Sequence, residues 1–317
     1  MKRKVDLMFT DRLIERIISM KNHSIVGIDP SYSIIPQFLK DKYIGDNGGS
    51  IESISEMLYV FSIEIIDHIY DIVPAVKPQI AFFERYGSAG LKIFEKVCSY
   101  AKEKGLLVIA DIKRGDIGST CEAYAEYYLS NATGSLDCDA ITINPYLGRD
   151  SINPFVEKCI DNDKGLFILV KTSNKSSIDI QDLISEQKRI YEHVAGIVSS
   201  LGEDFKGEKG YSPIGAVVGG TFKEEGEKLR QLMKNCYCLV PGFGAQGGVA
   251  SDLPGYFNED GLGAVINSSR GIIGAYLQDK YRHDYDEKSY GTAARMAAIS
   301  MRDEINKCLR EEGKMAW

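Results

Sequence analysis

The sequence has few of the features by which several classes of protein are recognised. No run of about 18 apolar residues occurs, so we expect no membrane span. The basic start MKRK is not followed by an apolar stretch, which argues against a secretory signal. The net charge of −7 does not suggest nucleic acid or another polyanion as a partner. We therefore expect a cytoplasmic protein.

Histidine and paired cysteine are also scarce. The 4 histidines are dispersed without the spacing of a metal site, so we expect no metal ion. The 7 cysteines are odd in number, include no CxxC motif and fall mostly in apolar segments. This usage indicates reduced core cysteines of a cytosolic protein rather than a disulfide framework.

Apolar segments of strand length recur along the chain and alternate with segments of helical periodicity. The 317 residues, 44% hydrophobic and 26% charged, have the composition of a globular protein. Eight short strands are predicted, at 24–28, 75–83, 106–110, 140–144, 166–170, 214–218, 237–240 and 264–267. This rhythm favours an α/β fold of the (β/α)8 or TIM barrel type, with a doubly wound open sheet as the second choice.

Helices are predicted between these strands and at both ends of the chain. Ser119 and Glu122 have the spacing of a capping box, which would begin the helix after the third strand. A helix is also expected over about 185–200. We expect one domain over 1–317, with a barrel core at about 24–276 and a helical extension at 277–317.

The stretch LLVIADIKRGDIGSTCE at 106–122 combines a predicted strand with charges in close succession. Asp111 and Lys113 are two residues apart, so they share one face of the carboxyl end of the strand. Asp116 follows where the strand passes into a helix. Burying such charges costs several kcal/mol unless they pair. They are therefore either a catalytic group or a structural ion pair at a barrel mouth, with Asp116 as a turn residue.

Other polar residues fall at the carboxyl ends of predicted strands, where barrel enzymes have their active sites. Lys77 lies between apolar residues, where a lysine is rarely placed without a partner, although its head could instead reach solvent. Asp29 is a candidate too, but alone it could be a turn residue before a proline. Asn144 and Ser173 are common loop residues, so their position is the main argument for them.

The loops after the seventh and eighth predicted strands are rich in glycine. They read PGFGAQGG at 241–248 and SSRG at 268–271. Glycine permits close approach of a backbone to an anion, and Arg270 can donate two hydrogen bonds to a phosphate. Barrels commonly bind phosphate at these two loops. The alternative is ordinary turn glycines beside an arginine that faces solvent.

The segment DIKRGDIGST at 111–120 closely resembles the signature of the orotidine 5′-phosphate decarboxylase family. The wider pattern is similar to the longer bacterial subgroup, in the motifs Asp29-Pro30, Lys77, NPYLG at 144–148, KTSN at 171–174, and PGFGAQGG before SSRG. Lys175 departs from that pattern, because proline is expected there. Two alternatives stay open: a related barrel decarboxylase or synthase that acts on a sugar phosphate with magnesium, and a nucleotide-binding protein without catalysis.

The resemblance implies decarboxylation of orotidine 5′-monophosphate to uridine 5′-monophosphate in pyrimidine biosynthesis, without metal or cofactor. Lys113 would protonate C6, and Asp111 would lie against the substrate carboxylate. Lys77 and Asp116 would complete the alternating charges, with Asp116 supplied by the partner subunit of a homodimer. The implied substrate contacts are Asp29 with ribose, Ser173 with the pyrimidine, Gln246 and Arg270 with phosphate, and further Thr120 (from the partner), Asn144, Pro241 and Ser269. The loop from 241 to Pro254 would be the lid.

Overall fold

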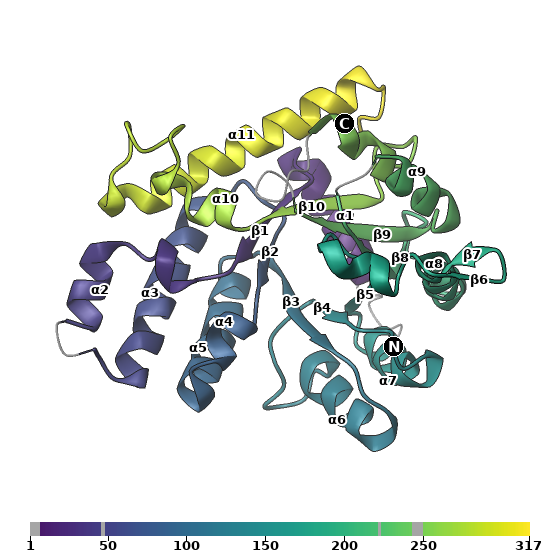
Figure 1. Ribbon diagram of the computed structural model, residues 1–317, viewed down its shortest axis with the longest axis horizontal. Coiled ribbons are helices and arrows are strands. Elements are labelled where there is room, and N and C mark those ends of the chain that lie inside the picture. The colour runs from purple at the N-terminus through teal and green to yellow at the C-terminus, as the bar shows by residue number, and fades with distance from the viewer. Residues whose placement is uncertain (1–6, 46–47, 221–222, 243–249) are drawn as a thin grey trace, which may run out of the picture.

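The computed structural model describes residues 7–45, 48–220, 223–242 and 250–317, and its centre is a closed barrel of parallel strands (Figure 1). The order around the barrel is β1 (Ser24–Ile28), β10 (Ala264–Ser268), β9 (Cys236–Pro241), β8 (Ser212–Val218), β5 (Gly165–Lys171), β4 (Ala140–Ile143), β3 (Leu107–Arg114) and β2 (Ala75–Pro78). Because β1 pairs with both β10 and β2, the sheet has no open edge. The predicted (β/α)8 barrel is confirmed, and the open sheet is excluded.

Helices surround the strands, as Figure 1 shows. They are α2 (Gln37–Tyr43), α3 (Ile51–Ile69), α4 (Ala81–Glu84), α5 (Gly87–Glu103), α6 (Gly118–Leu129), α7 (Arg149–Asp161), α8 (Ile190–Gly202), α9 (Lys223–Leu232), α10 (Arg270–Ile273) and α11 (Tyr290–Glu311). The strands are buried on both faces because these helices cover the outside and side chains fill the inside. In β8, for example, all seven positions are buried. Within the described residues, no helix has the length and apolar character needed to cross a membrane.

The amino end of the barrel is closed by α1 (Phe9–Met20). Leu13, Ile14 and Ile17 lie on one face of α1 and are fully buried among the inward-facing side chains of the strands. Phe9 also enters this cluster, and a Cβ on Gly165 would lie 2.2 Å from its ring. The interior of the barrel is therefore filled at this end.

Two strand predictions need correction. The segment expected as a strand over 75–83 leaves the strand at Pro78, and α4 begins three residues later. The strand expected over 106–110 instead continues to Arg114, with a register shift against β4 between Ala110 and Arg114. Lys113 has a φ of 46°, a left-handed conformation that β-strand residues do not normally adopt.

Two helix starts also differ from the prediction. The capping box is wrong: α6 begins at Gly118, and no side chain caps it. The helix expected from residue 185 begins at Ile190, because the preceding residues form a small hairpin of β6 (Ile184–Ser185) and β7 (Lys188–Arg189). All seven cysteines are free thiols and six are buried, as expected.

Candidate active site

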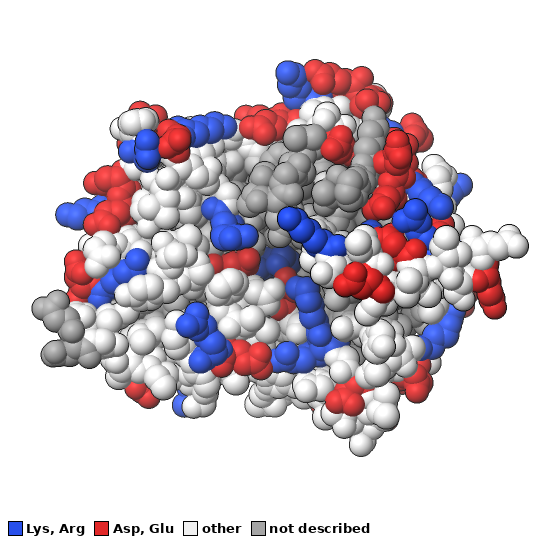
Figure 2. Space-filling model, viewed as in Figure 1, with Lys and Arg blue, Asp and Glu red and all other residues white. Residues whose placement is uncertain are grey.

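A cavity of about 270 Å³ lies at the carboxyl end of the barrel. All eight barrel strands, or the residues directly after them, contribute to its lining. The predicted site residues that line it are Asp29, Lys77, Asp111, Lys113, Ser173, Pro241, Ser269 and Arg270. Figure 2 shows a hollow near the middle of this face, with lysine or arginine side chains around it. The barrel therefore brings together residues that lie up to 241 positions apart in the sequence.

Asp111 is the centre of the charged group in this cavity. Its Oδ2 lies 2.5 Å from Lys77 Nζ, and its Oδ1 lies 2.5 Å from Lys113 Nζ. The side chains of Lys77 and Asp111 are each only 6% exposed, whereas that of Lys113 is 43% exposed. Of the two lysines, Lys113 therefore has the ammonium group that a molecule in the cavity can reach.

Two uncharged residues complete the surroundings of Asp111. Gln79 Nε2 donates a hydrogen bond to Oδ2 at 2.9 Å, and Thr142 Oγ1 donates one to Oδ1 at 2.9 Å. The carboxylate therefore accepts four hydrogen bonds, which matches its capacity as an ionised group. Sequence analysis missed both residues. The available signal was a polar residue following Pro78 in one case and a threonine within an apolar strand in the other.

The pKa of Asp111 lies well below its usual range. Burial would raise it, but the adjacent ammonium groups of Lys77 and Lys113 outweigh the cost of burial. For Lys77, burial would lower the pKa, but the carboxylates of Asp111 and Asp29 raise it above its ordinary value. The buried pair is therefore fully charged at neutral pH, and its charges are fixed before any substrate arrives.

The left-handed conformation of Lys113 is held by Thr142. The backbone N–H groups of Ile112 and Lys113 both donate to Thr142 Oγ1, each at 3.1 Å. Backbone strain of this kind costs about 1–3 kcal/mol and persists where surrounding contacts fix it. One hydroxyl group thus holds both the bulge in β3 and the carboxylate between the lysines.

Two buried oxygens in the cavity lack a hydrogen-bond partner within the part of the chain that is described. They are Oδ1 of Asp29 and Oδ1 of Asn267, and both residues line the cavity. A buried acceptor without a partner costs about 1–3 kcal/mol, so a ligand with hydroxyl groups would relieve this cost. On this side of the cavity, β1 and the loop after β10 pack closely at Gly27. A Cβ on Gly27 would lie only 1.9 Å from Ser269 Oγ.

The loops after β9 and β10 border the same cavity. Pro241 and Gly242 line it from one loop, and Ser269 and Arg270 from the other. The predicted pair of loops is therefore adjacent in space. Gln246 and half of the predicted lid fall in 243–249, which lies outside the described residues.

Three predicted site residues do not line the cavity of the single chain. Asp116 Oδ1 accepts a hydrogen bond from the following N–H group, and Asn144 Oδ1 accepts one from the N–H group of Tyr146. Thr120 is exposed on α6. Exposed apolar side chains lie in the same two loops, namely Ile117, Tyr146 and Leu147. The two loops approach closely, because a Cβ on Gly115 would lie 2.8 Å from the backbone oxygen of Asn144.

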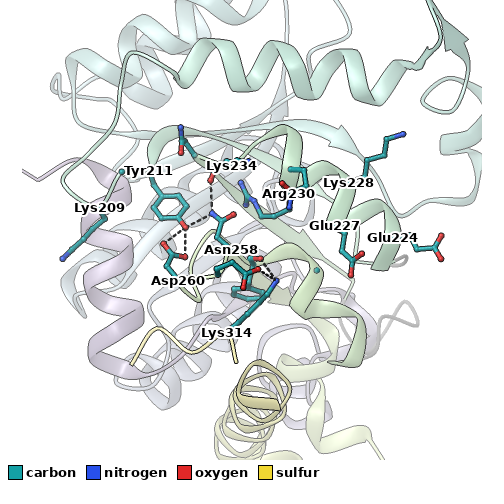
Figure 3. Close-up of a pocket in the computed structure, with 16 residues that line it drawn as sticks. Lys209, Tyr211, Glu224, Glu227, Lys228, Arg230, Lys234, Asn258, Asp260 and Lys314 are labelled. Carbon is teal, nitrogen blue, oxygen red and sulfur yellow. Dashed lines mark hydrogen bonds and ion pairs between the residues drawn. The ribbon is translucent and has the colours of Figure 1, made fainter. Parts of the chain in front are cut away.

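A larger hollow, of about 970 Å³, lies at the opposite end of the barrel near the starts of β8 and β9 (Figure 3). Several of its polar groups are already bound within the protein. The hydroxyl of Tyr211 donates to Asp260 and accepts from Asn258, while Arg230 donates to the backbone oxygens of Cys236 and Gly263. This network stabilises the barrel, and the catalytic candidates lie in the smaller cavity. Among the described residues, no group of three or more metal-ligating side chains is placed to hold a metal ion.

Alternating lysine and aspartate side chains at the carboxyl end of a closed parallel barrel define a barrel enzyme whose site is built on fixed charges. The chain belongs to the orotidine 5′-phosphate decarboxylase / HUMPS family, whose model matches residues 60–281.

Similar proteins extend this match to nearly the whole chain. Two relatives named orotidine 5′-phosphate decarboxylase are those of Caldicellulosiruptor saccharolyticus and Rhodopirellula baltica. The first is 42% identical over 96% of this chain and 99% of its own length, and the second is 41% identical over 94% and 99%. The solved structure of Leishmania donovani OMP decarboxylase is 28% identical, covers 95% of this chain and 98% of that chain, and has a TM-score of 0.71.

Proposed function

We propose that the chain decarboxylates orotidine 5′-monophosphate to uridine 5′-monophosphate in pyrimidine biosynthesis, and that Lys113 donates the proton to C6. The relatives of the same name, matched over nearly their full length, support the reaction. The observation that supports the role of Lys113 is its position: its ammonium group touches Asp111 and is the more exposed of the two lysines there.

The chemistry requires a cation beside the reacting carbon. Loss of carbon dioxide leaves a carbanion at C6, and a fixed ammonium group stabilises that charge without reorganisation of solvent. The same group is then within reach to donate its proton. Lys113 fulfils both roles in this proposal, while buried Lys77 keeps Asp111 in place.

Asp111 acts on the group that leaves. The family resemblance places its carboxylate against the carboxylate of the bound substrate, and its low pKa keeps it ionised there. Two like charges in a buried site destabilise the substrate complex, and the repulsion is relieved as carbon dioxide departs. Residues far from C6 must supply the binding energy that holds the substrate against this repulsion.

The remaining cavity residues bind the ribose, the pyrimidine and the phosphate. Asp29, with its unpartnered Oδ1, is proposed for the ribose hydroxyls and Ser173 for the pyrimidine. The phosphate is assigned to Arg270, which can donate two hydrogen bonds to it, together with Ser269 and Pro241. Gln246 is proposed for the phosphate on the sequence resemblance alone.

We further propose a cytoplasmic, single-domain homodimer in which each active site is shared. Asp116 and Thr120 lie outside the cavity of their own chain, as residues that serve the site of a partner would. Asn144, expected as a substrate contact, also lies outside it. Tyr146 is 77% exposed and Ile117 55% exposed beside them, and apolar surface of this kind favours association. A second copy would cover these side chains and bring Asp116 and Thr120 to the other cavity.

The loss of absorbance by orotidine 5′-monophosphate, measured with the purified protein, tests the reaction. Formation of uridine 5′-monophosphate at the same rate is the expected result, with no change on addition of a chelator. Turnover of a sugar phosphate that needs magnesium, without turnover of the nucleotide, would favour the related barrel enzymes instead.

A further inference from the structure

One wall of the cavity is formed by the residues that follow β5. Thr172, Ser173 and Asn174 all line the cavity. Behind them, the chain continues through a 3-10 helix at Lys175–Asp179 and the hairpin β6–β7 before α8 begins. The wall is therefore the first part of the long segment that connects β5 to α8. The shape of the wall depends on the contacts that hold this segment in place.

Gln181 connects this segment to the wall through both ends of its side-chain amide. Its Oε1 accepts a hydrogen bond from the backbone N–H of Thr172 at 2.9 Å, and its Nε2 donates one to Thr172 Oγ1 at 2.7 Å. The hydroxyl of Thr172 in turn donates to Asn174 Oδ1 at 2.6 Å. A single side chain outside the cavity therefore fixes the backbone and the hydroxyl of one lining residue and, through it, the side chain of another.

Gln181 is itself held firmly. Its N–H group donates to the backbone oxygen of Ser177, and its backbone oxygen accepts from the N–H group of Tyr191. The next residue, Asp182, accepts hydrogen bonds from Lys171 at the end of β5 and from Arg189 at the end of β7, at 2.6 and 2.7 Å. Burial would raise the pKa of Asp182, but these two cations lower it, so the ionic link persists at neutral pH.

We propose that Gln181 is a positioning residue for the pyrimidine: it holds Thr172–Asn174 in the orientation that receives the base. This proposal rests on the proposed function, which assigns Ser173 of this wall to the pyrimidine. Only an amide offers an acceptor and a donor in this geometry, because a carboxylate lacks the N–H group that binds Thr172 Oγ1. With a carboxylate at this position, the Thr172 hydroxyl could bind it only by donating its hydrogen, which would break the bond to Asn174 Oδ1. The effect of Gln181 must therefore appear in recognition of the base.

Binding of two ligands to Gln181→Ala tests the proposal. Uridine 5′-monophosphate has the base, and ribose 5-phosphate lacks it. We expect the Kd of the nucleotide to rise about tenfold, as the loss of one or two hydrogen bonds predicts, with almost no change for ribose 5-phosphate. Gln181→Glu, which keeps the acceptor alone, should lie between the wild type and Gln181→Ala. Gln231→Ala, on an exposed face of α9, is the matched control and should change neither Kd.

The possible outcomes separate this proposal from the proposed function. Suppose that the base adds affinity in the wild type. If Gln181→Ala keeps that added affinity, or weakens the binding of both ligands equally, the positioning role is wrong. If the base adds no affinity in the wild type, the assignment of the wall to the pyrimidine fails first. Should Gln181→Ala not fold, Thr172→Val removes the hydrogen bond from Gln181 Nε2 to Thr172 Oγ1 and keeps the one from the Thr172 backbone N–H. Thr172→Val must then raise the Kd of the nucleotide more than that of ribose 5-phosphate, or the proposal is contradicted.

Discussion

Thr142 stabilises a charged site although it carries no charge. Its Oγ1 accepts two backbone N–H groups from the bulge in β3 and donates to Asp111. Thr142→Val keeps the shape and removes these bonds, so we expect the free energy of unfolding to fall by about 1–3 kcal/mol. We also expect a lower kcat, because Lys113 and Asp111 lose their fixed positions. Thr142→Ser keeps the hydroxyl and should stay close to wild type, as measured by urea unfolding and steady-state kinetics. A valine variant with wild-type stability and kcat would contradict this role.

His23 makes stability depend on pH. It is fully buried between Phe257 and Trp317, and burial lowers its pKa to about 3. The unfolded chain takes up a proton at this residue below pH 6.5, whereas the folded chain does not, so stability falls as the pH falls. This one group should remove about 2 kcal/mol between pH 7.5 and 5. His23→Phe keeps an aromatic ring but cannot be protonated, so its urea unfolding should lose correspondingly less over that range. Equal pH dependence of the two proteins would contradict the prediction.

The three charged residues at the centre of the site could be predicted from the sequence, but the two uncharged residues that hold them could not. Lys77, Asp111 and Lys113 interrupt apolar segments, and such charges need partners. Gln79 and Thr142 give no comparable signal, since polar uncharged residues are common within and after strands. Their role arises only because the closed barrel brings β2 and β4 to either side of β3.

At the scale of elements, packing of α1 against the barrel depends on a glycine at the start of β5. Gly165→Ala would place a Cβ 2.2 Å from the buried ring of Phe9. We expect a loss of about 1–3 kcal/mol of unfolding free energy from this overpacking, measured by urea unfolding. Adding Phe9→Leu should recover part of the loss. Gly196→Ala, at a position in α8 where a Cβ meets nothing within 4 Å, is the matched control and should not destabilise. If Gly165→Ala leaves the free energy of unfolding unchanged, α1 can shift to make room for the methyl group, and the prediction is wrong.

The number and order of barrel strands could be predicted because each is a short apolar run between helical segments. Their ends were harder to predict, because contacts across the barrel decide them. β2 stops at Pro78, and the apolar residues that follow it pack as α4 instead. β3 continues past its apolar run because Thr142 of the neighbouring strand holds the bulge at Lys113. Pro78 is visible in the local sequence, but the contact between Lys113 and Thr142 is not.

At the scale of the whole molecule, a shared active site can be tested by mixing variants. Lys113→Ala and Asp116→Ala homodimers should both be nearly inactive. If each site takes Lys113 from one chain and Asp116 from the other, a mixed dimer has one intact site and one with both lesions. Random re-association makes about half the dimers mixed, so roughly a quarter of wild-type activity should return for a two-fold symmetric dimer.

The mixing experiment requires proof that chains exchange, which an affinity tag on one variant provides. If Asp116 acts within its own chain, every site in the mixture keeps a lesion. Confirmed exchange without recovered activity would therefore contradict the shared site, while the role of Lys113 in its own chain would remain open.

The central claim is that Lys113, beside Asp111, carries out the decarboxylation. The most direct measurement is the turnover of orotidine 5′-monophosphate by Lys113→Ala, together with its thermal unfolding and its Kd for uridine 5′-monophosphate. Our account predicts a folded protein that still binds the nucleotide but has lost at least about a thousandfold in kcat, because the proton donor and the cation beside C6 are both removed. A folded, nucleotide-binding Lys113→Ala variant with substantial turnover would contradict it.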